Sequence, residues 1–462
     1  MSTESWEFLI LLLCFAVIGV YVWLIKRHGT VLMGFTIFAA FFIFLTNLSA
    51  FFLGKVFFLP MDPPSSHHLE VWAYSAAALL AYAGGVWLAW RPLRRGMPRL
   101  NPFVAEPKLI MIFAIVGAVI MLFANLLPYI PSVSPVLFRL SMLIQLAFLG
   151  AVSAALDRGD YAKLALAVAI FIPVGMITIV TTGFAGMMGS FMLQPFLLFL
   201  FYRKPTWWKA GIFAVGVYVF FMIASVWFAT RSIIREGGLH GMETSEKVQS
   251  FYSQFAKAMD VSIFEPETVR TAAASRVDLS IYNIQQAAWM GKNEPYSMGR
   301  SLFVDPVLAL VPRLLWPGKT INLGDSEFIN RYTGLTLANQ NISVDTNMTF
   351  EFYANFSWPG VIVGLFFFGY AMAGMELRLM RPGNSLTMIL VLSLLLLGLS
   401  TGGRRAAAMM LENGATVIGA LILGKMLESS TLLKTRFDLP VGPRPVGPRG
   451  QPLVPRRLRT RP

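Results

Sequence analysis

The sequence predicts an all-α integral membrane protein with about 11 transmembrane helices and one large helical loop outside the membrane. Three observations lead to this fold class. Hydrophobic residues make up 56% of the chain and charged residues only 13%, which excludes an ordinary soluble protein. The apolar residues come in blocks of about 20, the length that crosses a bilayer as a helix. One long interruption, residues 231–354, separates the blocks and is rich in charged and polar residues.

The first block, Trp6–Ile25, is an uncleaved span with its N-terminus outside. Glu4 and Glu7 flank its start, and Lys26 and Arg27 follow its end. A cleaved signal peptide would have the opposite charge order and a small-residue cleavage site. Cys14, inside this block, is the single cysteine of the chain, so an internal disulfide and a cysteine-based metal site are excluded.

The remaining blocks follow in order and divide the chain into four regions. The predicted spans are Trp6–Ile25, Val31–Leu53, Val71–Trp90, Leu109–Tyr129, Val136–Leu156, Leu164–Thr181, Phe184–Tyr202, Ala210–Ala229, Asn355–Met375, Ser385–Ser400 and Ala406–Leu427. The regions are an eight-helix membrane part (1–230), the outer loop (231–354), a three-helix membrane part (355–427) and a basic tail rich in Pro, Gly and Arg (428–462).

Basic residues concentrate in segments that this topology puts inside. Residues 91–99 read RPLRRGMPR and residues 203–209 read RKPTWWK. Because Lys and Arg favour cytoplasmic loops, the net charge of +14 reflects membrane topology and needs no nucleic acid partner. We therefore expect a multi-pass protein of a bacterial inner membrane, with the N-terminus outside and the C-terminus cytoplasmic. The tail either lies along anionic membrane lipids or docks a partner.

The outer loop is expected to form helices. Thr244–Met259 carries an apolar stripe at helical spacing, and Thr268–Met290 contains no proline. Phe303–Trp316 is too short to cross the membrane and is broken by Pro306 and Pro312. We expect this piece to lie in the interface or to re-enter the membrane.

Arginines are the first candidate site residues, because many of them fall at the predicted outer face. They are Arg139, Arg231, Arg235, Arg270, Arg276, Arg300, Arg313, Arg404 and Arg405. A guanidinium matches phosphate geometry in a bidentate manner, so such a set suits a lipid-linked diphosphate. For any one of them, snorkelling to the interface or pairing with a carboxylate is the alternative.

Carboxylates and aromatic residues are the second ingredient. Glu351 and Asp278 are the candidate catalytic carboxylates, and each could instead pair with an arginine. Tyr353 and Trp316 suit stacking on sugars, although interface anchoring would explain them too. The pair His67–His68 is interpreted as a solvated loop pair. No metal motif occurs, and no cofactor is expected.

Two motifs resemble the Wzy-type polysaccharide polymerases, which include O-antigen and exopolysaccharide polymerases. VPRLLWPGKT contains Pro312, Arg313, Trp316, Pro317 and Lys319, and FEFYANFSWPGVIVG contains Glu351, Tyr353, Asn355, Phe356 and Gly360. The segment SRVDL at Ser275–Leu279 is also similar to a loop of that family. The chain departs from the pattern at Thr320, where the family has proline, and at Ser357, where it has glycine. An arginine that many members carry between two earlier spans is absent from TTGFAGMMGS, which begins at Thr181.

The resemblance implies a membrane glycosyltransferase, with a fold of the GT-C class, that polymerises undecaprenyl-diphosphate-linked oligosaccharide repeat units. Catalytic roles would fall to Glu351, Asp278, Arg276 and Arg313. Binding of the diphosphate or sugar would fall to Arg139, Arg231, Arg235, Arg270, Arg300, Lys319, Arg404, Arg405, Trp316 and Tyr353. Expected partners are the lipid-linked oligosaccharide, membrane lipids, a flippase and a chain-length regulator. An O-antigen ligase is the alternative enzyme, and a polysaccharide transporter is the alternative of another class.

Overall fold

The computed structural model describes residues 3–28, 34–56, 65–91, 107–126, 134–182, 280–310, 325–336, 346–379, 384–400 and 406–429, with isolated positions between 194 and 256. Within these ranges the chain is helical and forms no strand. Five helices are long and apolar enough to cross a membrane: Glu4–Leu24, Ser66–Trp90, Pro107–Ala124, Arg139–Leu156 and Met348–Leu379. These are the properties of an α-helical membrane protein.

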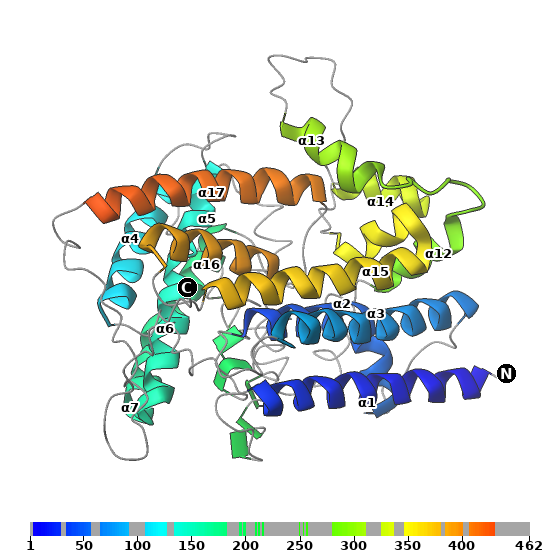
Figure 1. Cartoon of the computed structure of the whole chain (residues 1–462), viewed down its shortest axis with the longest axis horizontal. Helices are drawn as coiled ribbons and strands as arrows, with labels where there is room; N and C mark the ends of the chain where they lie inside the picture. The colour runs from blue at the N-terminus through cyan, green and yellow to red at the C-terminus, as the bar shows by residue number, and fades with distance from the viewer. Residues whose placement is uncertain are drawn as a thin grey trace, which may run out of the picture.

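The helices of the first half are α1 (Thr3–His28), α2 (Phe35–Val56), α3 (Ser66–Trp90), α4 (Pro107–Leu126), α5 (Ser134–Ser141), α6 (Leu143–Arg158) and α7 (Tyr161–Thr182). Those of the second half are α12 (Ser280–Trp289), the π-helical turn η3 (Arg300–Val304), α13 (Asp305–Leu310), α14 (Asp325–Thr333), α15 (Met348–Leu379), α16 (Leu386–Ser400) and α17 (Ala406–Ser429). Figure 1 shows α1, α3 and α15 running alongside one another.

Glycines allow α3 and α15 to pack with their backbones almost touching. A Cβ built on Gly85 of α3 would lie 2.1 Å from the carbonyl oxygen of Phe366. A Cβ built on Gly369 of α15 would lie 2.4 Å from the carbonyl oxygen of Tyr82. Small residues at a helix crossing increase van der Waals contact, which drives helix association where water is absent.

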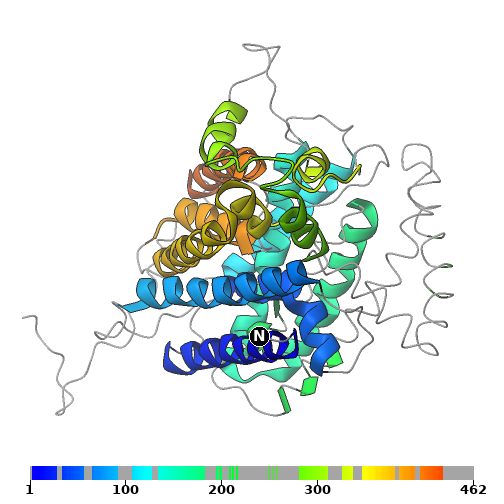
Figure 2. The same cartoon turned by 90° about the vertical axis from the view of Figure 1, so that its right-hand side faces the viewer.

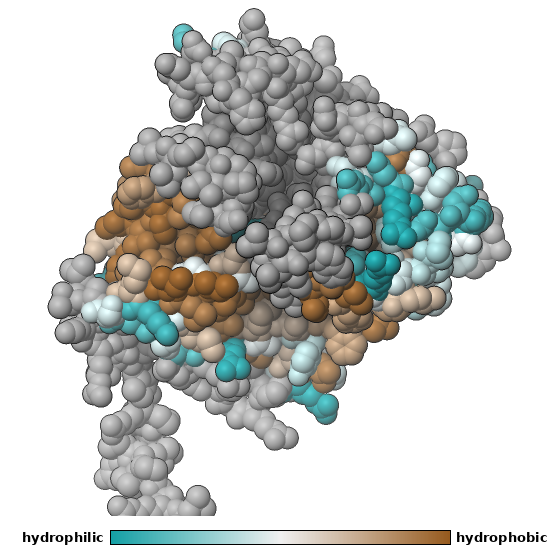
Figure 3. All heavy atoms as spheres, turned by 90° about the horizontal axis from the view of Figure 1, so that it is seen from above, coloured by the Kyte–Doolittle hydropathy of each residue, from teal (hydrophilic) through white to brown (hydrophobic). Residues whose placement is uncertain are grey.

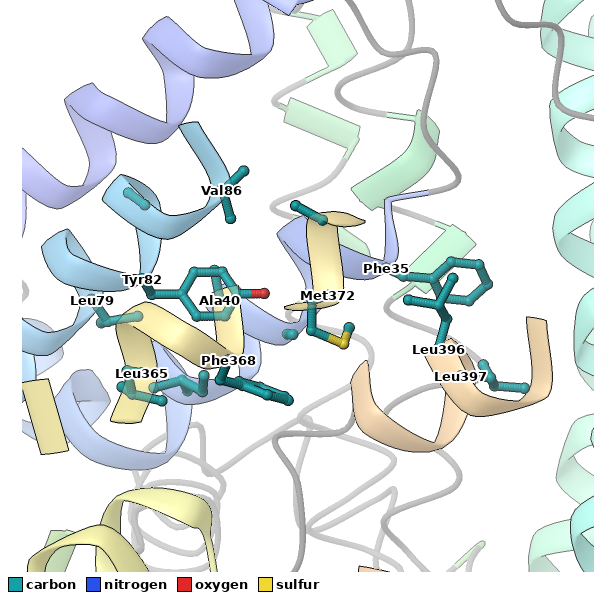
Figure 4. Packing of buried hydrophobic residues seen from close by; sticks show 14 of the residues in the cluster. Phe35, Ala40, Leu79, Tyr82, Val86, Leu365, Phe368, Met372, Leu396 and Leu397 are labelled. Carbon is teal, nitrogen blue, oxygen red and sulfur yellow. The ribbon is translucent and has the colours of Figure 1, made fainter. Parts of the chain in front are cut away.

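Side chains from four helices fill the space around this crossing (Figure 4). Phe35 and Ala40 come from α2, Leu79, Tyr82 and Val86 from α3, Leu365, Phe368 and Met372 from α15, and Leu396 and Leu397 from α16. The packing brings the first 90 residues of the chain against its last third.

A buried carboxylate joins the end of α15 to the start of α2. Glu376 is fully buried, and its oxygens accept hydrogen bonds from the backbone N–H groups of Phe35, at 3.1 Å, and Thr36, at 3.3 Å. The Thr36 hydroxyl donates to the same carboxylate. Because the first N–H groups of a helix have no partners within the helix, Glu376 acts as their cap and as a counter-charge to the helix dipole.

One end of the bundle collects the polar elements. The start of α1, α12 and α14 lie at the same end of the molecule in two perpendicular views (Figures 1 and 2). Seen from above, hydrophilic atoms gather at that end, while hydrophobic atoms cover much of the remaining described surface (Figure 3). The sequence assigns the N-terminus and the long loop to one side of the membrane, and this arrangement is compatible with that assignment.

Three predicted boundaries differ from the structure. Helix α3 begins at Ser66, so His67 and His68 are helical and not in a loop. Nδ1 of His68 accepts a hydrogen bond from the backbone N–H of Ser65 at 3.2 Å, which stabilises a polar first turn that hydropathy alone does not detect. The fifth predicted span is two helices, α5 and α6, separated by a turn at Met142.

The helix that contains the ninth predicted span, α15, begins at Met348, about two turns before the predicted start at Asn355. Two other predicted spans, Phe184–Tyr202 and Ala210–Ala229, and the predicted loop helix Thr244–Met259 lie outside the described residues apart from isolated positions. The same holds for the part of Thr268–Met290 that precedes Ser280.

Candidate functional site

The site is organised around a break near the start of α15. Phe356 (φ −140°, ψ 19°) and Ser357 (φ 59°, ψ −161°) leave the helical conformation and divide α15 in two. Pro359 has no N–H and cannot donate to the carbonyl of Asn355. The break is therefore a kink with an identifiable cause.

The loop after α12 satisfies the carbonyls that the kink sets free. The backbone N–H of Ser297 donates to the carbonyl of Ala354 at 2.9 Å, and that of Met298 donates to the carbonyl of Asn355 at 3.2 Å. The Asn355 side chain accepts from the N–H of Gly299 at 2.9 Å and donates to Ser301 Oγ at 2.7 Å. The loop and the kink thus form one hydrogen-bonded unit, because each supplies the partners that the other lacks.

Helix α14 fastens this loop from its other side. Arg331 Nε donates to Glu294 Oε1 at 2.6 Å, and the Tyr332 and Ser297 hydroxyls share a hydrogen bond. The hydrogen bond with Glu294 raises the pKa of Arg331 above its ordinary value. The ion pair is half-exposed, so it positions the loop more than it stabilises the fold.

A buried network of amide side chains on α2 and α12 fixes the first turn of α15. Oδ1 of Asn47, on α2, accepts hydrogen bonds from Asn283 at 2.6 Å, from Thr349 at 2.9 Å and from Asn347 at 3.2 Å. Gln286 donates to the carbonyl of Phe350 at 3.0 Å. Because buried polar groups are costly unless they are hydrogen-bonded, this network specifies how α2, α12 and α15 meet.

A cluster of titratable side chains lies where α3 meets the start of α15. His67, Glu70 and Tyr74 lie at i, i+3 and i+7 on one face of α3, opposite Tyr353. The Tyr353 hydroxyl donates to Glu70 Oε1 at 3.3 Å, and Nδ1 of His67 is 3.6 Å from Glu70 Oε2. The Tyr74 ring stacks on that of Tyr353 with centroids 5.4 Å apart, and the Tyr296 ring lies 6.3 Å away. We call these five side chains the tyrosine–glutamate cluster.

The cluster is partly open to solvent, with 40% of the Glu70 side chain and 33% of the His67 side chain exposed. Sequence reasoning missed it, because it places His67–His68 in a loop and begins the third span at Val71. The pattern His-x-x-Glu-x-x-x-Tyr at helical spacing was the available signal. Its meaning depended on a helix start at Ser66.

Four of the predicted site residues fall within the described ranges. Tyr353 belongs to the tyrosine–glutamate cluster, whereas Glu351, two residues earlier on α15, is only 1% exposed. Arg300 is exposed, with Nε 3.7 Å from Oδ1 of Asp305. Arg139 lies on α5 beside α16 and α17, since a Cβ built on Gly398 would lie 3.4 Å from its Nη1.

The structure brings Glu351, Tyr353 and Arg300 to the unit formed by the kink and the loop, and Arg139 to a different helix junction. The other predicted residues lie outside the described ranges: Arg231, Arg235, Arg270, Arg276, Asp278, Arg313, Trp316, Lys319, Arg404 and Arg405. Within the described part of the chain, no three His, Cys, Asp or Glu side chains are grouped as a metal ligand set.

Comparisons with known proteins identify a family but no activity. A family model described as a domain of unknown function (DUF8712) matches residues 25–379. No curated protein and no solved structure matches the chain. The matched range includes α2, α3, α12 and α15, and therefore every residue of the tyrosine–glutamate cluster.

Proposed function

The chain belongs to the family described as a domain of unknown function (DUF8712), and we propose that it is a membrane glycosyltransferase. In this proposal it polymerises undecaprenyl-diphosphate-linked oligosaccharide repeat units at the outer face of a bacterial inner membrane. The proposal includes the topology predicted from the sequence, with eleven spans, the N-terminus outside and the C-terminus in the cytoplasm.

The observation that carries the proposal is the juxtaposition of polar and apolar groups at the kink of α15. The Glu70–Tyr353 hydrogen bond lies one helical turn before the kink. The kink itself and η3 carry the exposed side chains of Phe356, Trp358 and Phe303, with Trp358 50% and Phe303 69% exposed. A lipid-linked sugar matches these two kinds of group. Its hydroxyl-rich head needs hydrogen-bond acceptors, and its hydrocarbon chain needs an apolar surface.

The motif of the resemblance supports the same reading. The run from Glu351 to Gly360 forms the beginning of a membrane-spanning helix and carries the kink. A Cβ built on Gly360 would lie 2.6 Å from Cβ of Phe356, so the kink needs glycine at the last position of the motif. Asn355, Phe356 and Gly360 of the motif thus form the kink and its contact with the loop 291–299.

The chemistry would be a displacement at the anomeric carbon of the donor. A hydroxyl of the acceptor sugar forms the new C–O bond as the C–O bond to diphosphate breaks, and the polyprenyl diphosphate leaves with the electron pair. Guanidinium groups suit the developing negative charge on the leaving group. Arg276 and Arg313 are the arginines on which the resemblance bears most directly, and Arg139 and Arg300 are further candidates.

The test is polysaccharide chain length in cells that lack the wild-type gene. We expect Arg276→Ala and Arg313→Ala, expressed at normal levels, to abolish long chains and to leave single lipid-linked repeat units at the outer face. Arg158→Ala, at the exposed end of α6, is the matched control and should retain full-length chains. Full-length polysaccharide with both alanine variants would overturn the arginine assignment.

Three further outcomes separate the alternatives. Long chains that accumulate on the lipid carrier in cells expressing the alanine variants would indicate that the wild type is a ligase. Repeat units retained at the inner face in those cells would indicate a transporter. If the purified protein released polyprenyl diphosphate from lipid-linked oligosaccharide only when a second acceptor lipid was added, polymerase activity would be excluded.

A further inference from the structure

We propose that Glu70 is the catalytic base of this site, taking the proton from the attacking hydroxyl of the acceptor sugar in the tyrosine–glutamate cluster. The inference rests on the proposed glycosyl transfer and names a residue outside both sequence motifs. It is carried by the access, the orientation and the surroundings of the Glu70 carboxylate.

Access distinguishes Glu70 from the two carboxylates of α15, Glu351 and Glu376. Glu351 is 1% exposed and Glu376 is fully buried against backbone N–H groups, so neither can contact a sugar in this conformation. The Glu70 side chain is 40% exposed. A general base must lie within hydrogen-bond reach of the proton that it removes, which Glu70 can do without any opening of the helix bundle.

Orientation comes from the side chains that contact Glu70. The Tyr353 hydroxyl holds Oε1 at 3.3 Å, and Nδ1 of His67 lies 3.6 Å from Oε2. Within the described part of the chain, no lysine or arginine forms an ion pair with this carboxylate. A carboxylate that is oriented by a hydroxyl and not neutralised by a cation keeps its capacity to accept a proton.

Tyrosine rings pack beside the carboxylate. Tyr74 and Tyr353 are buried and stack on each other, and Tyr296, which is half-buried, is the ring of the cluster that a sugar can reach. The Tyr74 hydroxyl has no hydrogen-bond partner among the described residues. Because it is buried, Tyr74 supports the Tyr353 ring and does not itself contact a sugar in this conformation.

The backbone next to the cluster is strained. Ser357 (φ 59°, ψ −161°) is in a region that is almost restricted to glycine, and its side chain interacts with Tyr353, one helical turn away. Backbone strain of this kind persists where the surrounding structure imposes it, and it concentrates at functional sites. Here it separates the turn of α15 that carries Tyr353 from the rest of the helix.

In the proposed step, Glu70 accepts the hydroxyl proton as the oxygen attacks the anomeric carbon, and the diphosphate departs with the electron pair of the broken C–O bond. The proton then passes from the half-exposed Glu70 carboxylate to solvent. Glu70 is a catalytic residue in this scheme, and Tyr353 and His67 are positioning residues. Glu351 has no place in the proton transfer.

The experiment uses the purified full-length protein in proteoliposomes and lipid-linked oligosaccharide extracted from cells that lack the gene. The release of polyprenyl diphosphate is measured together with equilibrium binding of the same oligosaccharide. For Glu70→Gln we expect turnover to fall by about 10²–10⁴-fold, the usual contribution of a general base, while the Kd changes by less than about threefold. Glu327→Gln, an exposed carboxylate on α14, is the matched control and should behave like the wild type.

Variants of Tyr353 separate orientation from folding. Tyr353→Phe keeps the ring and removes the hydroxyl, so we expect kcat to fall by about 10-fold with KM unchanged, the effect of one hydrogen bond to a charged group. Tyr353→Leu also removes the ring on which Tyr74 and Tyr296 pack, so it should lower the amount of folded protein in addition to kcat. A merely structural role for Tyr353 would change the amount of folded protein and not kcat per folded molecule.

The outcomes are distinguishable. If the wild type releases polyprenyl diphosphate and Glu70→Gln does so at the same rate, Glu70 only joins α3 to Tyr353, and this inference is wrong while the proposed function stands. If the wild type releases none from lipid-linked oligosaccharide, the proposed function fails, and the role of Glu70 fails with it.

Discussion

The two parts of α15, before and after the kink, differ in the polar groups around them. Beyond the kink the helix is apolar, packs on α3 through Gly369, and carries one buried carboxylate, Glu376, whose oxygens accept from two backbone N–H groups and a hydroxyl. Before the kink, polar side chains from α2, α3, α12 and α15 meet, and Glu70 remains half-exposed.

The two carboxylates, Glu376 and Glu70, differ in what surrounds them, and this difference separates a structural carboxylate from a functional one. The donors around Glu376 include the backbone N–H groups of Phe35 and Thr36, which have no acceptor within α2. The Glu376 carboxylate therefore holds α2 to α15. Glu70 is held by a single tyrosine hydroxyl and faces solvent. We therefore expect changes beyond the kink to affect folding and changes before it to affect activity.

Gly85→Ala should have the largest effect on stability, because Gly85 lies where α3 packs on the apolar part of α15. The new methyl group would lie 2.1 Å from the backbone carbonyl of Phe366, so α3 and α15 must move apart. We expect a loss of about 3 kcal/mol of stability or more, seen as a lower melting temperature in detergent. Gly84→Ala is the matched control, since its methyl group would lie 3.7 Å from the Phe366 ring. Equal melting temperatures for the two variants would contradict the close crossing.

Glu376→Leu should have the next largest effect and sharpens the contrast between the two glutamates. It leaves the N–H groups of Phe35 and Thr36 buried without their acceptor, at a cost of about 2 kcal/mol. Glu376→Gln keeps one acceptor oxygen and should cost less. Turnover per folded molecule should stay at the wild-type value in both variants, in contrast to Glu70→Gln, and a selective loss of turnover would show that the contrast is wrong.

Asn355→Ala tests the hydrogen-bonded unit of kink and loop. The variant removes the acceptor for the N–H of Gly299 and the donor to Ser301, at about 1–2 kcal/mol. We expect faster amide hydrogen exchange in the peptide 291–305, measured by mass spectrometry. Asn293→Ala is the control, because the side chain of this exposed asparagine donates to the carbonyl of Trp289 at the end of α12 and not to the kink. Unchanged exchange in the first variant would mean that Asn355 does not hold the loop.

Ser357→Gly should have the smallest effect and the opposite sign. Glycine adopts φ 59°, ψ −161° without strain, and the gain is partly offset by its larger conformational entropy in the unfolded chain. We expect a net stabilisation of about 0.5–1 kcal/mol, read as a higher melting temperature. Ser357→Val should lower the melting temperature instead, because a β-branched residue is strongly disfavoured at positive φ. A fall with glycine would remove the argument from strain.

Much of the helical framework could be predicted from the sequence, and the details of the site could not. The apolar blocks near α1, α2, α4, α7, α16 and α17 were found within a few residues of the helices. The polar first turn of α3 and the early start of α15 were missed, because hydropathy does not detect helical turns that face other protein segments. Pro359 is a signal for an irregularity that the predicted span Asn355–Met375 did not use, and the positive φ falls at Ser357, where no local pattern indicates it.

What the sequence by itself determined is the class of the protein. A hydrocarbon solvent imposes a local condition on length and hydropathy, and each block can be tested against it alone. The partnership of Glu70 with Tyr353, 283 positions later, was decided only by the tertiary structure. The distance between those two side chains depends on how closely α3 and α15 approach and on the loop that holds the first turns of α15 through its hydrogen bonds to Ala354 and Asn355.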